Sequence, residues 1–100
     1  MRLRFASVAE LELAKALDYY ESCGPGLGAR FLAEVQLASE RIETHPLAWR
    51  RLSPNVRRCL LHRFPYGIFY RVHDEEIEIL SVGDLRQDPR RWEEWIKKQT

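Results

Sequence analysis

Short apolar runs alternate with turn residues over the second half of the chain. Runs rich in β-branched and aromatic residues cover 56–64, 68–73 and 77–82, and turn residues follow the first two at Pro65–Gly67 and Asp74–Glu76. Proline fixes φ and glycine can adopt a positive φ, so the chain can reverse tightly after the first run. This pattern predicts a three-stranded antiparallel meander around which the rest of the chain is organised.

The last run of this meander is apolar on both faces. By alternation Ile77 and Ile79 share one face, and Leu80 and Val82 share the other. We therefore predict a strand that is covered on both sides or central in its sheet.

Two helices are predicted before the meander. Their apolar residues recur every three or four positions, so each helix presents one face to a core. These residues are Ala9, Leu13, Ala16, Leu17 and Tyr20 in the first helix and Leu27, Phe31, Val35, Ala38 and Ile42 in the second. Gly24–Pro25 separates the helices, and His45–Pro46 ends the second because proline disfavours helical geometry in the preceding residue. The short connection predicts an antiparallel helical hairpin.

The chain begins with a short alternating segment, Arg2–Phe5, which fits a strand at the edge of the meander. Ser7 and Glu10 have the spacing of a capping box, so we expect the first helix to start at Val8.

A loop with two prolines and a Trp-Arg-Arg centre, 46–55, joins the second helix to the meander. Trp49 could stack on a base while Arg50 and Arg51 hold phosphates. The alternative is that Trp49 and Leu52 pin the loop against the sheet edge, which is the commoner role of a single tryptophan in a small domain.

The last segment predicts a C-terminal helix, because Asp88–Pro89 is an N-cap followed by proline at the first helical position. Trp92, Trp95 and Ile96 form its apolar face. This face either lies on the sheet or awaits a partner.

The sequence 1–100 has the composition of one small soluble domain, with 45% hydrophobic and 31% charged residues. At this size about 60–65% of the unfolded surface is buried on folding, so a partner that completes the core is expected. No apolar run approaches the roughly 20 residues of a membrane span, and the first residues lack a signal-peptide core. We expect a cytoplasmic protein that does not contact a membrane.

The net charge of +1 conceals an uneven distribution. Residues 1–43 carry five basic and seven acidic groups, residues 74–100 carry five and eight, and residues 44–73 carry six arginines and no acid. Clustered arginines supply a positive field and bidentate donors, so the middle third is a candidate surface for phosphate or an acidic partner. Alternatively, these arginines pair with acids elsewhere and form an ordinary solvated surface.

The cysteines and histidines lack the spacing of a metal site. Cys23 and Cys59 are expected to be reduced in a cytosolic protein. We therefore expect neither a metal nor another cofactor.

The predicted order β-α-α-β-β-β-α and the residues of the meander resemble the RelE/ParE superfamily of toxins from type II toxin–antitoxin systems, often labelled plasmid-stabilisation proteins. Residues 56–92 carry the likeness: an Arg-hydrophobic-Pro-Tyr turn, a Tyr-Arg-Val strand, an acidic turn, and a last strand that runs into Arg-x-Asp-Pro-Arg-Arg-Trp. The resemblance implies an α+β fold, with a twisted antiparallel sheet, the helical hairpin on one face and a C-terminal helix. It also implies a basic concave surface near the last strand, which a cognate antitoxin covers.

Members of this superfamily divide into ribosome-dependent mRNA endonucleases and inhibitors of DNA gyrase. The nucleases use lysine, arginine and tyrosine, and the resemblance places Arg63, Tyr66 and Arg86 on positions of that set as candidate catalytic residues. The candidates for binding phosphate or the target are eight arginines: Arg50, Arg51, Arg58, Arg63, Arg71, Arg86, Arg90 and Arg91.

The nuclease set is incomplete in this chain. Gly67 stands where the nucleases have another arginine, and Trp92 stands roughly where they have a C-terminal tyrosine. The chain has three lysines, Lys15, Lys97 and Lys98. None lies in the loop before the meander, where arginine stands instead, and arginine is a poor base because its pKa exceeds about 12.

Histidine could supply the missing base, because its pKa lies near 6.5. His62 is next to Arg63, and His73 ends the following run. Adjacent strand residues point to opposite faces, however, so His62 and Arg63 cannot act on one phosphate from a strand. The alternative for each histidine is a surface or core-edge role.

Arg86 follows the last strand, and Gly83 before it permits an unusual turn. We expect Arg86 to lie at a strand-to-helix corner and to project over a concave face. In the alternative, Arg86 pairs with Asp84 or Asp88 and only shapes the loop.

With an incomplete nuclease set, the resemblance predicts a toxin that arrests growth when free of its antitoxin, with DNA gyrase or another non-nucleolytic target. The first alternative is a ribosome-dependent mRNA endonuclease, with the ribosome and mRNA as partners. The second is a non-toxic, degenerate family member that only binds the antitoxin. Whether the chain is an enzyme depends on which of these holds.

Overall fold

The computed structural model describes residues 1–99 as three helices and one five-stranded sheet. In chain order the elements are β1 (Arg2–Phe5), α1 (Ser7–Cys23), α2 (Leu27–Thr44), β2 (Arg50–Ser53), β3 (Val56–Leu60), β4 (Tyr66–His73), β5 (Glu76–Asp84) and α3 (Pro89–Lys98). The strands lie in the order β1-β5-β4-β3-β2. The α+β class, the helical hairpin and the meander of β3, β4 and β5 are confirmed. None of the three helices is both long and apolar enough to cross a membrane.

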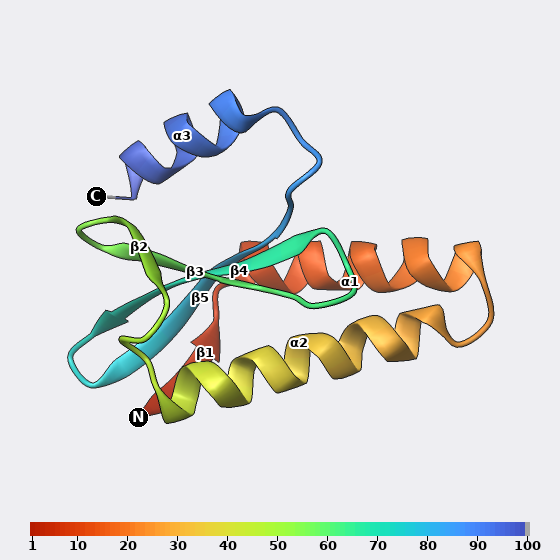
Figure 1. Ribbon diagram of the computed structural model, residues 1–100, viewed down its shortest axis with the longest axis horizontal. Helices are drawn as coiled ribbons and strands as arrows, with labels where there is room; N and C mark the ends of the chain where they lie inside the picture. Colours follow the sequence, from red (N-terminus) through yellow and green to blue (C-terminus); the bar gives the residue numbers. More distant parts are fainter. Residues whose placement is uncertain (100) are drawn as a thin grey trace.

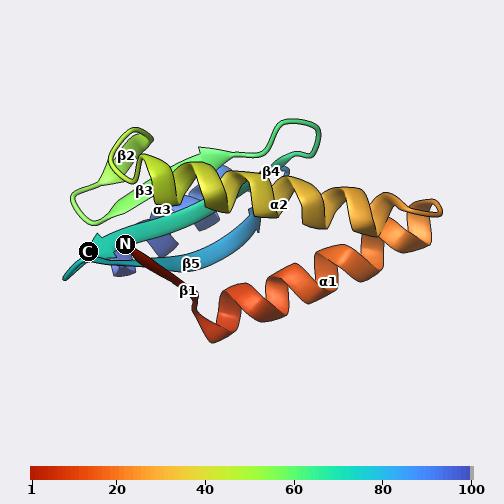
Figure 2. The same cartoon turned by 90° about the horizontal axis from the view of Figure 1, so that it is seen from below.

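Helices lie on both faces of the sheet (Figure 1). The α1–α2 hairpin covers one face, with α1 beside β5 and α2 beside β3, whereas α3 lies on the opposite face (Figure 2). A larger core lies between the hairpin and the sheet, and its centre includes the fully buried Phe31, Ile42, Ile68, Tyr70 and Ile79. A smaller core lies under α3, so the apolar face of the C-terminal helix packs on the sheet.

The two edge strands differ from the predicted sheet. The predicted loop 46–55 contains β2, which pairs with β3 and places Leu52 in the smaller core. β1 pairs with the meander as predicted, but it runs parallel to β5, so the sheet is mixed rather than wholly antiparallel. The apolar residues of β1 lie opposite Ile77 and Ile79. Alternation of this kind fits a parallel or an antiparallel pair equally well, which is why the sequence pattern leaves the direction open.

A β-bulge interrupts the alternation of β5. Two consecutive residues of β4 lie opposite Ile79 and Ser81, so Leu80 is the extra residue of the bulge. Leu80 packs in the smaller core, but Val82, beyond the bulge, packs in the larger core with Ile79. The prediction that Leu80 and Val82 share a face is therefore wrong, because the bulge shifts the alternation by one residue.

β3 ends at Leu60, before the predicted end of the run at Phe64. Phe64 turns toward the larger core, where its ring centre lies 4.8 Å from that of Tyr20. His62 and Arg63 consequently lie in a loop rather than on a strand. The prediction that these two side chains point to opposite faces of a strand is therefore wrong.

The capping box at the start of α1 is not formed. Ala6 is the N-cap residue, and no side chain bonds to the first turn. The Ala6 amide donates to the carbonyl of Ile79 at 2.9 Å, so the chain continues along β5 up to Ala6. Ser7 is already in the helix, one position too late to cap it, and the helix starts before Val8.

Glu21 of α1 caps the start of α2. Its two carboxylate oxygens accept from the amides of Gly26 at 3.2 Å and Gly28 at 3.1 Å. Gly26 adopts a φ of 83°, which side-chain-bearing residues rarely adopt. This contact holds together the short connection that makes the hairpin antiparallel.

Candidate functional site

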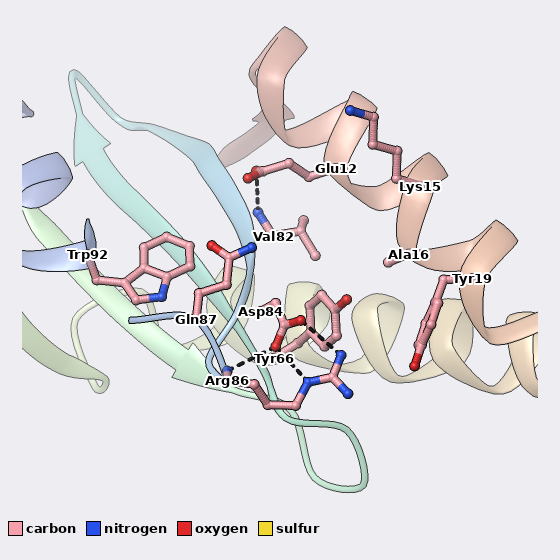
Figure 3. A pocket seen from close by; sticks show the side chains of 10 residues that line it. All are labelled: Glu12, Lys15, Ala16, Tyr19, Tyr66, Val82, Asp84, Arg86, Gln87 and Trp92. Carbon is pink, nitrogen blue, oxygen red and sulfur yellow. Dashed lines mark hydrogen bonds and ion pairs between the residues drawn. The ribbon is translucent and has the colours of Figure 1, made fainter. Parts of the chain in front are cut away.

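A cavity of about 370 Å³ opens where α1, the end of β5 and the start of α3 meet (Figure 3). It is lined by Glu12, Lys15, Ala16, Tyr19, Tyr66, Val82, Asp84, Arg86, Gln87 and Trp92. The lining comes from both helical layers and from the sheet between them. A concave surface with several convergent polar groups is where a small protein most often binds a ligand or partner side chain. We therefore take this cavity as the candidate functional site.

Asp84 holds Arg86 in place at the corner between β5 and α3. One carboxylate oxygen accepts from the Arg86 backbone amide and from Nε, both at 2.9 Å, and the other accepts from Nη2 at 2.8 Å. These hydrogen bonds lower the pKa of Asp84, and the carboxylate raises the pKa of Arg86. Arg86 is thus a permanent cation whose planar fork is oriented by the chain itself.

Both expectations for Arg86 are met in part. It pairs with Asp84, as an ordinary loop arginine does, and it also lines the cavity with 51% of its side chain exposed. The unusual turn expected at Gly83 is absent, because Gly83 lies within β5, and Gly26 is the only glycine of residues 1–99 with a positive φ.

Two tyrosines lie near the Arg86 guanidinium (Figure 3). The Arg86 Cζ atom is 5.9 Å from the ring centre of Tyr19, within the range of a cation–π contact. Burial raises the pKa of Tyr66, the nearby Asp84 carboxylate adds to this shift, and Arg86 opposes it. Tyr66 therefore keeps its proton at neutral pH and can act as a hydrogen-bond donor.

Glu12 caps the free edge of β5 beside the cavity. β1 pairs with β5 only as far as Ile79, so at Val82 no strand lies on the side of β5 away from β4. Glu12 Oε1 instead accepts from the Val82 amide at 3.0 Å and from the Ser81 hydroxyl at 2.8 Å. Burial raises the pKa of Glu12, and the two hydrogen bonds oppose the shift.

Glu12→Gln is expected to remove a pH-dependent contribution to stability. Because the folded-state pKa of Glu12 lies above its ordinary value of 4.5, folding favours the protonated carboxyl. The free energy of unfolding of the natural chain should therefore fall relative to that of the variant as the pH rises from about 4 to 7. Urea unfolding at several pH values measures both free energies. If the free energy of unfolding of the natural chain instead rises relative to that of the variant with increasing pH, the burial account is contradicted. Glu12→Ala, which leaves the Val82 amide without an acceptor, should be less stable than Glu12→Gln throughout.

Trp92 closes the cavity on the side of α3. Its ring stacks on Phe69 with 4.7 Å between ring centres and 9° between the planes. Gly83 lies beneath it, and a Cβ on Gly83 would come within 2.2 Å of the Trp92 ring. The tryptophan that stands roughly at the nuclease tyrosine position is thus a packed wall of the cavity.

The structure brings together two of the three candidate catalytic residues. Tyr66 and Arg86 line the same cavity, whereas Arg63 lies exposed in the loop before β4. Lys15 adds a lysine from α1, an element that the family likeness does not point to.

The eight arginines predicted to bind phosphate or the target do not gather on one surface. Three are paired with carboxylates of the chain within 3.1 Å: Arg71, Arg86 and Arg90. Two line a separate groove beside α2: Arg50 and Arg58. The remaining three are exposed outside the cavity and that groove: Arg51, Arg63 and Arg91. Of these eight, Arg86 alone contributes to the cavity as the structure describes it.

α1 contributes three polar cavity residues that the apolar periodicity conceals. Glu12, Lys15 and Tyr19 are spaced at i, i+3 and i+7, so they share one face of the helix, next to its apolar stripe. In the sequence these three polar residues look like the solvated face of the helix. The packing of α1 beside β5 is what brings it close to Arg86.

The histidines and cysteines lie outside the cavity. His73 Nε2 is 3.1 Å from a carboxylate oxygen of the exposed Asp74, and His62 lines the groove beside α2. Cys23 and Cys59 are free thiols. Within residues 1–99 no group of three or more histidine, cysteine, aspartate or glutamate side chains is arranged to hold a metal ion.

Comparison with known proteins points to one family of toxins. Residues 3–89 match the family described as ParE toxin of the type II toxin–antitoxin system, parDE. Toxin ParE2 of Mycobacterium tuberculosis is 31% identical over 100 residues, which cover 99% of this chain and 95% of the relative.

Solved structures agree with this result. The chromosomal ParDE toxin–antitoxin system from P. aeruginosa contains a chain with a TM-score of 0.64 and 26% identity, which covers 85% of this chain and 96% of that chain. The isolated E. coli RelE toxin has a TM-score of 0.55 and 18% identity, over 99% of this chain and 98% of its own, and this likeness supports the fold alone.

Proposed function

Since this chain belongs to the ParE family of toxins from type II toxin–antitoxin systems, we propose that, when no antitoxin is bound, it arrests growth by acting on DNA gyrase or another non-nucleolytic target. The family supports a toxin with an antitoxin as its partner. The choice of target rests on the ParE type of the match and on the chemistry of the cavity.

The Asp84–Arg86 pair is the observation that carries this choice. Cleavage of RNA through its 2′-hydroxyl needs a base that takes up the proton and a donor for the leaving oxygen. Arg86 stays protonated, and Asp84 is a weak base because its pKa is lowered and three hydrogen bonds engage it. Tyr66, with its raised pKa, can donate a proton but is a poor base. An oriented cation between tyrosines suits recognition of a carboxylate or phosphate better than proton transfer.

Lys15 supports the mRNA endonuclease as a second candidate. It is exposed and lines the same cavity as Tyr66 and Arg86, so lysine, arginine and tyrosine meet there as they do in the nucleases. Lys15 comes from α1, however, rather than from the loop before the meander. A nuclease that works through this cavity would therefore have its lysine at a new position.

Expression of the chain alone in a bacterium is expected to arrest growth, and co-expression of the cognate antitoxin is expected to relieve the arrest. Action on gyrase should produce DNA breakage and an SOS response without specific cuts in translated messages. Specific cuts in messages without DNA breakage would replace this proposal with the nuclease. Unimpaired growth, together with antitoxin binding, would instead identify a degenerate family member that serves as an antitoxin-binding module.

A further inference from the structure

The outer side of α1 carries apolar residues that the fold leaves uncovered. Val8 is 59% exposed, Leu11 is 63% exposed and Tyr19 is 48% exposed. These residues belong to neither core, unlike the stripe of α1 that packs on the sheet. An apolar helix face that stays exposed in the folded chain is a candidate contact surface for another molecule.

The three residues form one line along the helix together with Lys15. Val8, Leu11, Lys15 and Tyr19 are spaced at i, i+3, i+7 and i+11, so successive turns of the helix place them side by side. We call this line the outer stripe of α1. Lys15 and Tyr19 also line the cavity at Arg86, so the outer stripe leads directly into the candidate site.

The concave surface continues beyond the cavity toward α3. A smaller hollow of about 170 Å³ shares three residues with the cavity and adds three others: it shares Glu12, Gln87 and Trp92 and adds Ser81, Arg91 and Trp95. The outer stripe, the end of β5 and the start of α3 therefore belong to one face of the molecule, with the cavity at its centre (Figure 3). A partner seated on the cavity would contact both helices.

The free charges of this face are cationic. Lys15 and Arg91 form no ion pair with any of residues 1–99. The two carboxylates are engaged by the chain itself, because Asp84 binds Arg86 through both oxygens and Glu12 binds the edge of β5. This arrangement favours an occupant that brings negative charge.

A protein surface matches this combination of features better than a nucleic acid does. A folded protein can present a carboxylate beside an aliphatic side chain, and protein interfaces combine an apolar centre with complementary charges around it. A phosphodiester backbone would match the cations, but it would gain nothing from Val8 and Leu11. The aliphatic half of the outer stripe therefore selects the class of partner.

We propose that the outer stripe of α1 is the surface on which a target protein docks, with an apolar side chain of the target on Leu11 and a carboxylate of the target in the cavity at Arg86. This inference rests on the proposed function, because it concerns the target of the free toxin. It goes further in making that target a protein and in assigning part of its contact surface to α1. Val8 and Leu11 then help to determine which surface the toxin accepts, although neither lines the cavity.

Growth arrest on induction of the full chain tests the docking surface. Leu11→Ser should raise the toxin level that halves growth about tenfold, as expected when an aliphatic contact is lost from an interface. Val8→Ser should act in the same direction with a smaller effect. Both residues are exposed and fill no core volume, so the melting temperature should shift little. Leu11→Met keeps an apolar side chain of similar size and should retain toxicity.

Leu37→Ser is the matched control for Leu11→Ser. Leu37 is 45% exposed in α2, so the substitution makes the same chemical change on another helix. We expect it to change the toxin level that halves growth less than about twofold. Equal losses of toxicity in the two serine variants would show a general effect of reduced apolar surface and would overturn the assignment to α1.

The natural chain reports separately on the proposed function. If it causes no growth arrest, or if it cuts translated messages at specific sites, the proposed function fails and the docking surface fails with it. If it arrests growth without such cuts and Leu11→Ser remains fully toxic, the docking surface alone is refuted.

Fluorescence anisotropy with a labelled single-stranded RNA oligonucleotide tests the class of partner. We expect Leu11→Ser and the natural chain to bind this oligonucleotide equally, because an aliphatic side chain contributes little to phosphate binding. A loss of RNA binding that parallels the loss of toxicity would show that the outer stripe binds RNA, and would contradict a protein target.

Discussion

Gly83→Ala is expected to displace Trp92 and loosen α3 from the sheet. The added Cβ would lie 2.2 Å and 2.7 Å from two atoms of the Trp92 ring and 2.9 Å from the Phe69 ring. These rings are rigid and stacked on each other, so neither can move without giving up the contact. Overpacking of this kind costs about 1–3 kcal/mol, and the lost burial of the smaller core adds to that cost. Urea unfolding measures the loss, and a red shift of tryptophan fluorescence reports the exposure of Trp92.

Gly67→Ala is the matched control for this prediction. Gly67 lies directly opposite Gly83 in the neighbouring strand and is also buried. A Cβ added there would meet the Arg58 side chain at 3.2 Å, which is a flexible neighbour that can shift. We therefore expect a loss of less than about 1 kcal/mol. Equal losses at both positions would show that the strands require glycine for their backbone rather than for the approach of Trp92.

A second variant tests the role of the indole directly. In a Trp92→Ala background, Gly83→Ala should lower the free energy of unfolding much less, because the atoms that clash are then absent. Additive losses would rule out the contact between these two residues as the cause.

Features that depend on local spacing could be predicted from the sequence. The apolar stripes of α1 and α2 predict the residues that face the core, because a helix repeats every 3.6 residues whatever it packs against. Phe31, Val35, Ala38 and Ile42 are accordingly buried. The meander follows in the same way from alternating residues and turn chemistry.

Features that depend on pairing between distant segments could not be predicted. The bulge at Leu80 arises from the register between β4 and β5, and alternation alone gives no sign of it. The capping box fails because the Ala6 amide bonds to Ile79, more than seventy residues away in the sequence. The short β2 contains two arginines, so its apolar content is too low to stand out from a loop.

Some residues of the candidate site could likewise be predicted from the sequence, and others could not. Tyr66 and Arg86 could be identified because the family likeness marks the turn and the corner that carry them. Arg63 is marked by the same likeness, but the turn of Phe64 into the core leaves it outside the cavity. Lys15 and Tyr19 join the site through the packing of α1 beside β5, which no local pattern encodes.

Arg86→Ala is expected to remove toxicity while leaving the fold almost unchanged. The side chain is half exposed and fills no core volume, so the melting temperature should shift little. The cavity, however, loses its oriented cation. If this cation anchors a carboxylate or phosphate of the target, its loss should weaken target binding about 10- to 150-fold. Growth after induction, the melting temperature and antitoxin binding are measured together, so that loss of toxicity by unfolding is recognised.

Two further substitutions separate the geometry of Arg86 from its charge. Arg86→Lys keeps the charge but cannot form the fork that Asp84 holds, so it should retain only part of the toxicity. Arg90→Ala removes an arginine that bonds to Asp88 in the same manner. Arg90 lies four residues after Arg86 and does not line the cavity. We expect this substitution to leave toxicity nearly unchanged.

The comparison of Arg86 with Arg90 decides between a site and a general charge effect. Both arginines sit two residues after the aspartate that binds them, and both are exposed, so their local chemistry is nearly the same. They differ in position, because Arg86 lines the cavity beside Tyr19, whereas Arg90 is not part of the lining. If Arg86→Ala stays fully toxic, Arg86 has no part in the activity. If both alanine variants lose toxicity equally, the target responds to the positive charge of this end of the molecule, and the cavity is not the site. Loss at Arg86 alone, with antitoxin binding and melting temperature retained, is the result that a recognition site at this cavity requires.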